Sequence, residues 1–206
     1  IKPEDTPYKI LYLGIKDGNY LASFIVKDEV KKEAKSARKE LEENGRKKSI
    51  VLSGDDQKIV TASLEETGVK EGHGELLPEE KLGRVKELAS NGKVCYVGDG
   101  INDSLALSSA SVGIAISDGA AIAREIADVT ISADNLHEIV TLKRLSTALM
   151  KRIHNNYRTI IGVNGGLIAL GVAGVIMPTT SALLHNLSTL TISLRSMRNY
   201  LPKEEE

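Results

Sequence analysis

The sequence has little of what several protein classes require. Its 206 residues include one cysteine, Cys95, so it cannot form an internal disulfide. Because Cys95 falls in an apolar run, we expect a buried, reduced thiol rather than a metal ligand. The net charge is -1, aromatic residues make up 3%, and no basic stretch is interleaved with aromatics. No nucleic-acid partner is therefore expected, because such binding needs clustered lysine and arginine.

Length and the N-terminal sequence set further limits. A chain of 206 residues buries one ordinary domain and little more. The N-terminal residues lack the pattern of a signal peptide. The chain begins at Ile1 without a methionine. We expect it to be a fragment of a longer protein.

The most informative segment is residues 98–107, with the sequence Gly-Asp-Gly-Ile-Asn-Asp-Ser-Leu-Ala-Leu. It follows residues 93–97, which are typical of a buried parallel strand, and it leads into a predicted helix at 104–109. Gly98 and Gly100 allow the backbone to turn sharply between the two. The segment therefore predicts a strand, a tight turn and a helix.

Three polar side chains of this turn predict a binding site. In open α/β sheets, ligands bind beyond the carboxyl ends of the strands, where Asp99, Asn102 and Asp103 would lie. Ligand sets made only of oxygen favour magnesium over zinc or copper. The alternative is an Asx-rich turn whose side chains only cap the next helix.

Residues 28–131 alternate between helical and extended patterns, which predicts a parallel sheet with helical crossovers. Glycine or Asn-Gly ends several of the helices, and Pro78 begins one. The helices are expected at 31–44, 56–67, 78–91, 104–109 and 118–127, and the strands at 49–52, 94–97, 112–116 and 129–131. Before them, residues 8–15 and 20–26 predict a hairpin, which is marginal in water without a larger sheet.

Residues 159–177 form an uncharged apolar run. About 19 residues at about 1.5 Å of rise would cross most of a bilayer core, so we expect a transmembrane helix. The alternative is a buried helix of a soluble protein. Gly162 and Gly166 are spaced to let another helix approach closely.

Residues 179–200 predict a second, more polar span, which would need neighbouring helices to shelter its polar face. Basic residues flank the two spans on one side, and this bias predicts a hairpin with both ends in the cytoplasm. The basic residues are Lys143, Arg144, Lys151, Arg152, Arg158, Arg195, Arg198 and Lys203.

Several motifs together resemble the P-type ATPases, cation pumps whose phosphorylation domain belongs to the haloacid dehalogenase superfamily. Residues 98–107 resemble the hinge signature of these pumps, and Ser53-Gly54-Asp55 resembles their Thr-Gly-Asp. Residues 78–81, Pro-Glu-Glu-Lys, resemble the segment with their conserved lysine, and residues 27–34 resemble the entry to the phosphorylation domain in the heavy-metal branch. The resemblance covers nearly the whole chain.

The resemblance implies a domain organisation. Residues 1–28 would be the closing hairpin of the nucleotide-binding domain, 29–152 the phosphorylation domain, 153–201 two transmembrane helices and 202–206 a charged cytoplasmic tail. The fold class would be α/β, an incomplete Rossmann-like haloacid dehalogenase parallel sheet followed by an α-helical transmembrane hairpin. The sheet would lack the central strand that ends in the nucleophile, leaving a slot between the strands at 49–52 and 94–97 with two unpaired edges.

The resemblance also implies roles for individual residues. In the family, the aspartate of Asp-Lys-Thr-Gly-Thr attacks the γ-phosphate of ATP, and this sequence contains no such pentapeptide. The remaining roles would be magnesium binding by Asp99 and Asp103, phosphate contacts by Asn102, Ser53, Gly54, Asp55 and Gly100, and neutralisation of phosphoryl charge by Lys81. Asp55 could instead cap the next helix, and Lys81 could lie on a solvated helix face.

The function implied is that of part of an ATP-driven heavy-metal pump, working through an aspartyl-phosphate, with Mg²⁺ as cofactor and ATP as substrate of the complete pump. The isolated chain is expected to be inactive. Its expected place is the cell membrane, in contact with lipid and the missing pump segments, with the phosphorylation domain in the cytoplasm. The alternatives are a non-catalytic, membrane-anchored, magnesium-binding remnant or interaction partner, and a phosphatase of the same superfamily.

The transported transition-metal cation is the least defined feature. His185, Ser188 and Thr189 share one helix face and are candidate ligands. Hydrogen bonds between helices are the alternative role for His185. The other histidines, His73, His137 and His154, have no ligand spacing and are expected in surface or interhelix positions.

Overall fold

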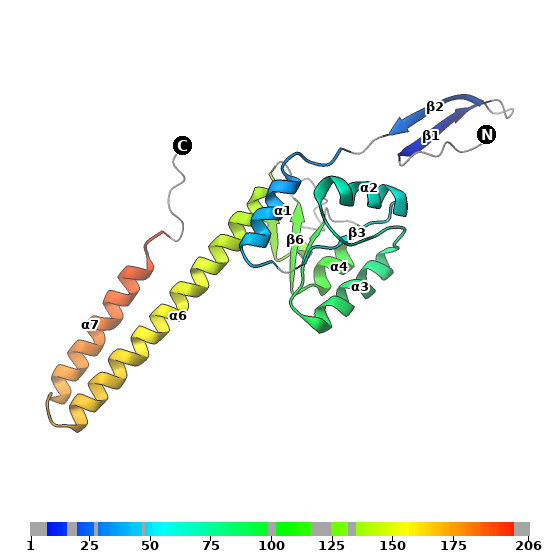
Figure 1. Ribbon diagram of the computed structural model, residues 1–206. Helices are drawn as coiled ribbons and strands as arrows, with labels where there is room; N and C mark the ends of the chain where they lie inside the picture. The colour runs from blue at the N-terminus through cyan, green and yellow to red at the C-terminus, as the bar shows by residue number, and fades with distance from the viewer. Residues whose placement is uncertain are drawn as a thin grey trace. The chain divides into compact units, whose positions relative to one another are not determined.

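The computed structural model describes residues 8–15, 20–26, 29–46, 48–98, 102–116, 125–131 and 135–199 (Figure 1). Two compact units divide the chain at Val140, and each is described by itself. Most of the helix expected at 118–127 lies outside the described residues.

The first unit contains a three-stranded parallel sheet. Its strands are β5 (Cys95–Gly98), β6 (Val112–Ile116) and β7 (Val129–Ile131), hydrogen-bonded in that order. The short helix α4 (Ser104–Ser109) connects β5 to β6, which is the crossover that parallel strands require. The predicted parallel α/β arrangement is confirmed over these strands.

Two further strands form a separate parallel pair. β3 (Val51–Leu52) pairs with β4 (Gly72–His73), and α2 (Gln57–Thr67) connects them. β4 was not predicted, because a Gly-His dipeptide has no strand pattern. Within the described part of the chain, β3 and β5 each end their own sheet, and no strand lies hydrogen-bonded between them. This arrangement agrees with the expected slot.

Helices cover one face of β5 and form the core there. Val85 of α3 (Pro78–Asn91) packs with Tyr96 of β5 and Leu107 of α4, and all three are buried. Leu52 of β3 packs against the same cluster. Both sheets therefore contribute to one core, although their strands do not pair.

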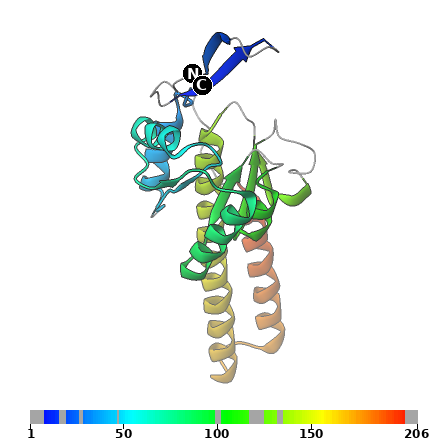
Figure 2. The same ribbon diagram turned by 90° about the vertical axis from the view of Figure 1, so that its right-hand side faces the viewer.

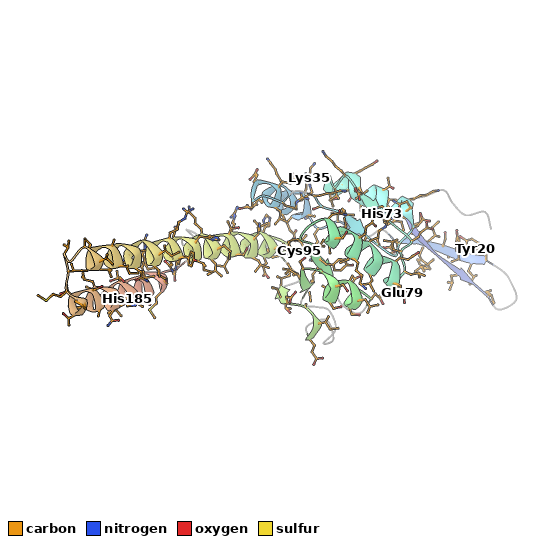
Figure 3. All side chains as sticks on the ribbon, turned by 90° about the horizontal axis from the view of Figure 1, so that it is seen from below. Tyr20, Lys35, His73, Glu79, Cys95 and His185 are labelled. Carbon is orange, nitrogen blue, oxygen red and sulfur yellow. The ribbon has the colours of Figure 1, made fainter. Side chains whose placement is uncertain are left out.

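The other face of β5 is open, which overturns the prediction for Cys95. Along β5, Tyr96 and Gly98 are buried while Cys95 and Val97 are exposed. The prediction of a buried thiol is wrong, because it requires cover on both faces of the strand, and α3 and α4 cover one face. Nearby atoms still exclude enough water from Cys95, labelled in Figure 3, to raise the pKa of its thiol.

Caps define the helices that precede the core. Asp56 accepts a hydrogen bond from the Lys58 N–H at 2.7 Å and begins α2, and Gly68, at φ 71°, ends it. Arg38 of α1 (Ala34–Glu43) donates from Nε to the Thr67 carbonyl at 3.0 Å. This bond joins α1 to the end of α2.

The N-terminal hairpin forms as predicted. β1 (Lys9–Gly14) pairs antiparallel with β2 (Tyr20–Val26), and the turn at 16–19 lies outside the described residues. Among the described strands, these two pair only with each other. Leu11 and Phe24 are each 57% exposed. The hairpin therefore has little packing to hold it, as expected for an isolated pair of strands.

The second unit contains α7 (Pro178–Ser196) and most of α6 (His137–Val172). The predicted helix at 159–177 is wrong at its C-terminal end. Gly174 has a φ of 72°, the Gly174 N–H donates to the Gly171 carbonyl at 3.0 Å, and the Val175 N–H donates to the Leu170 carbonyl at 2.9 Å. This is a Schellman ending, and it stops the helix inside the apolar run.

Polar side chains join α6 to α7, which lie side by side in Figures 1 and 2. Arg152 donates to the Ser196 and Asn199 carbonyls at 3.0 Å, and Asn156 donates to the Ser196 hydroxyl at 2.7 Å. The close packing predicted at Gly162 and Gly166 is not observed among the described residues, since no atom beyond the local helix backbone lies within 4 Å of a Cβ built at either.

The described helices do not meet the usual criteria for a membrane span. None of them is both long and apolar enough to cross a bilayer. The apolar run is divided where α6 ends at Val172, and α7 carries several hydroxyl and amide side chains. The expected transmembrane hairpin is observed here as two paired helices.

The other histidines lie at positions that agree with their expected roles. His137, at the start of α6, contacts Glu40 Oε1 and Ser36 Oγ of α1, each at 3.3 Å. His73 lies 3.5 Å from Glu71, and His154 contacts the Met150 carbonyl of its own helix. None of these contacts is a metal-ligand arrangement.

Gly113 provides a test of the packing between α4 and β6. A Cβ at Gly113 would lie 2.6 Å from the Leu107 carbonyl oxygen, so Gly113→Ala should destabilise the fold by about 1–3 kcal/mol through overpacking. The control is Gly83→Ala in α3, where no atom lies within 4 Å of the added Cβ. It should stabilise the fold by about 0.5–1 kcal/mol. Urea unfolding of both variants measures the difference, and equal stabilities would contradict the packing described.

Candidate functional site

A lysine and an aspartate from different elements meet at the end of β5. Lys81 lies in the first turn of α3, where Glu80 accepts a hydrogen bond from the Leu77 N–H at 2.8 Å. The Lys81 Nζ donates to Asp103 Oδ1 at 2.9 Å, and both side chains are 12% exposed. The alternative that Lys81 lies on a solvated helix face is therefore wrong. The structure brings together two of the predicted site residues, Lys81 and Asp103.

A tyrosine completes the surroundings of Asp103. The Tyr96 hydroxyl donates to the same oxygen, Oδ1, at 2.9 Å. Oδ2 faces Gly98, where an added Cβ would lie 2.8 Å from it. Sequence reasoning missed Tyr96, although the period of two in a strand places Tyr96 and Gly98 on one face, toward the following helix.

The Ser53 segment forms a tight turn at the end of β3. The Ser53 hydroxyl donates to Asp55 Oδ2 at 3.0 Å, and the Asp55 N–H donates to the Ser53 Oγ at 3.2 Å. The Ser53 N–H donates to the His73 carbonyl at 2.9 Å, which continues the pairing of β3 with β4. Because Asp56 caps α2, the alternative that Asp55 is the helix cap is wrong.

The loop before α3 ties this turn to the helix that carries Lys81. The Leu76 N–H donates to the Ser53 carbonyl at 3.0 Å, and the Glu75 N–H donates to the Asp55 carbonyl at 2.7 Å. Glu75 has a φ of 56° and is the only non-glycine residue with positive φ in the described part. Such a conformation is costly for a side chain with a Cβ and recurs at functional sites. A Cβ at Gly54 would lie 3.4 Å from the Leu76 carbonyl, so the two segments are in contact.

The remaining predicted residues are less defined. Asp99 and Gly100 lie outside the described residues, and Asn102 is exposed. Among the residues that the structure describes, no three His, Cys, Asp or Glu side chains group as metal ligands. Asp103 nevertheless suits a hard cation, because its carboxylate is nearly buried and the described donors all reach Oδ1, leaving Oδ2 without one.

His185, labelled on α7 in Figure 3, contacts the other helix of the hairpin. Its Nδ1 lies 2.9 Å from the Asn164 Oδ1 of α6. The hydroxyls of Ser188 and Thr189 donate to the His185 carbonyl at 2.7 and 3.1 Å. The interhelix hydrogen bond is thus present, and it would also hold the proton on Nδ1 and leave a lone pair on Nε2.

Comparison with known proteins agrees with this geometry. Residues 3–111 match the model of the haloacid dehalogenase-like hydrolases. A manganese-exporting P-type ATPase of Mycobacterium tuberculosis is 36% identical over 184 residues, covering 88% of this chain and 26% of that protein. A probable cadmium-transporting ATPase of Listeria monocytogenes is 35% identical over 175 residues, covering 84% of this chain and 25% of that protein.

A solved structure is similar over both units of the chain. The crystal structure of a zinc-transporting PIB-type ATPase in the E2.Pi state has a TM-score of 0.83 at 27% identity, covering 93% of this chain and 31% of that one. The chain thus spans about a quarter of the length of the pumps that it matches in sequence. It belongs to the haloacid dehalogenase-like hydrolase family and resembles the heavy-metal-transporting P-type ATPases.

Proposed function

We propose that this chain is the part of an ATP-driven heavy-metal pump that carries the magnesium and phosphate side of the phosphorylation site, together with a membrane hairpin. The observation that carries the proposal is the buried pairing of Lys81 with Asp103. A cation and a carboxylate that are both withdrawn from water are typical of a site built to stabilise transferred charge.

In the proposed site, Asp103 binds Mg²⁺, and Lys81 and the Ser53 turn interact with the phosphoryl group. When bound at Asp103, Mg²⁺ would neutralise phosphate charge and orient the phosphoryl group. The Lys81 ammonium supplies positive charge beside the same carboxylate. The Gly54 N–H, and the Ser53 hydroxyl once it leaves Asp55 Oδ2, would donate to phosphate oxygens. The attacking aspartate would come from a pump segment outside this sequence, because no Asp-Lys-Thr-Gly-Thr occurs in it.

The α6–α7 hairpin supports a membrane location in the assembled pump. Neither helix buries its apolar side chains within the second unit, and α7 has no buried residue. Large exposed apolar surfaces mark contacts with a membrane or a partner. The exposed side chains include Ile160, Ile161, Ile168, Leu170, Val172, Val175, Leu183, Leu187, Leu190 and Leu194. With basic residues on one side of the hairpin, the proposed orientation places the phosphorylation domain in the cytoplasm.

His185 is the proposed contact for the transported cation. Its bond to Asn164 fixes the ring, and fixed imidazoles with one free nitrogen are common ligands for transition metals. Ser188 and Thr189 lie within one turn of it and keep oxygen lone pairs for a cation or its water.

Metal sensitivity of a host that lacks the gene tests the proposed function. The deletion strain should become sensitive to one or a few of zinc, cadmium, copper and manganese. The complete gene should restore growth, and the same gene with Asp103→Asn should not, although it produces equal protein. Unchanged growth of the deletion strain on every metal would contradict the proposed pump function. It would favour a non-catalytic, magnesium-binding protein, which the absence of Asp-Lys-Thr-Gly-Thr from this sequence supports.

A further inference from the structure

We propose that Tyr96 is a positioning residue for the magnesium-binding carboxylate of Asp103, an inference that rests on the proposed function and deepens it. Tyr96 is in the strand before the turn, and no sequence motif assigns it a role. Its hydroxyl donates to Asp103 Oδ1 at 2.9 Å from a ring that is 9% exposed.

The hydrogen bond from Tyr96 helps to fix the orientation of the Asp103 carboxylate. Oδ1 receives both Tyr96 and Lys81, each at 2.9 Å, so the rotation of the carboxylate is fixed from two directions. Oδ2 lies against Gly98, where an added Cβ would be 2.8 Å from it, so only a glycine fits beside the carboxylate in this orientation. Oδ2 is the oxygen of Asp103 that no donor among the described residues reaches.

Packing prevents the tyrosine from adopting another position. The ring lies in the core cluster with Val85 and Leu107, and Leu52 of β3 packs against that cluster. A hydroxyl on a ring held in this way loses little entropy when it bonds, unlike the flexible Lys81 side chain. Tyr96 fixes the geometry, and Lys81 supplies the charge.

Loss of the Tyr96 hydrogen bond should lower the affinity of Asp103 for a metal ion. Hydrogen bonds from outer residues to a ligating carboxylate orient it, and their loss typically costs about 10–100-fold in metal affinity. Tyr96→Phe removes only the hydroxyl and keeps the ring in the core. It should therefore weaken metal binding by about 10–100-fold while the fold persists.

Titration of the whole 206-residue chain with Mn²⁺ tests the proposal, with free Mn²⁺ measured by electron paramagnetic resonance. Tyr96→Phe is compared with the wild type, with Asp103→Asn, and with Tyr157→Phe, a matched loss of hydroxyl at an exposed site on α6. Circular dichroism confirms that each variant is folded at the temperature used. If Tyr96→Phe weakens the fold, 4-aminophenylalanine at position 96 restores a donor on the same ring and should return the affinity to within about threefold of the wild type.

The outcomes distinguish this inference from the proposed function. Weakened binding in Tyr96→Phe, with Tyr157→Phe unchanged and the donor analogue rescuing, supports the positioning role. Binding that depends on Asp103 but is unchanged in Tyr96→Phe overturns the positioning role alone. A wild-type chain that binds no Mn²⁺ overturns both.

Discussion

Asp103→Asn is expected to destabilise the first unit by about 3 kcal/mol and to abolish its stabilisation by Mg²⁺. The substitution keeps the size of the side chain but removes the charge that Lys81 faces at 2.9 Å. Breaking a buried ion pair from one side typically costs about 3–5 kcal/mol, because the remaining charge stays unpaired. We use the lower end of this range, because both side chains are still 12% exposed and water can partly solvate the unpaired charge.

The measurement is urea unfolding with and without saturating Mg²⁺. In the wild type, Mg²⁺ should raise the midpoint, since any ligand that binds only the folded state stabilises it. Asp56→Asn is the control, because asparagine caps a helix about as well as aspartate, and its stability should change by less than about 0.5 kcal/mol. Equal behaviour of Asp103→Asn and Asp56→Asn would contradict the role given to Asp103.

A separate strand is expected to bind between β3 and β5 and to stabilise the chain. Each of these strands presents an unpaired edge among the described residues, and Cys95 and Val97 leave one face of β5 exposed. A synthetic extended segment that ends in Asp-Lys-Thr-Gly-Thr would pair with both edges. At a concentration 100 times its dissociation constant, it should add about 2.7 kcal/mol to the stability.

Thermal unfolding and labelling of Cys95 report this binding. The inserted strand should slow the reaction of the exposed thiol with a maleimide, because Cys95 is the first residue of the strand edge with which the segment pairs. The control is the same segment with a proline at its centre, which cannot donate a hydrogen bond inside a sheet. If the two segments stabilise the chain equally, the slot does not exist as described.

The sequence predicted the structural elements whose ends are set by residues close to them in the chain. Gly68 ends α2 as predicted, because a cap acts on its own backbone, although the residue that begins the helix is Asp56 and not Asp55. The motif at residues 98–107 placed Asp103 correctly between β5 and α4. The partner of Lys81, which is 22 residues away in sequence, is known only from the structure.

The features that sequence reasoning missed depend on distant contacts. The exposure of Cys95 depends on which helices cover β5, and the two-residue β4 exists only because β3 lies beside it. Tyr96 looked like an ordinary strand residue, because its hydroxyl finds a partner only after the turn folds back. The early end of α6 follows from one left-handed glycine, Gly174, within a run whose composition alone favours a continuous helix.

Phosphorylation by ATP labelled at the γ-phosphate tests the central claim most directly. The chain is incubated with Mg²⁺ and labelled ATP, alone and with the segment that ends in Asp-Lys-Thr-Gly-Thr, and is then precipitated with acid. We predict that the chain alone takes up no label, and that any acid-stable, hydroxylamine-labile label formed in the mixture is on the added segment and requires Asp103 and Lys81. An acyl phosphate on the chain alone would contradict the account, because it would show that these residues already include the nucleophile.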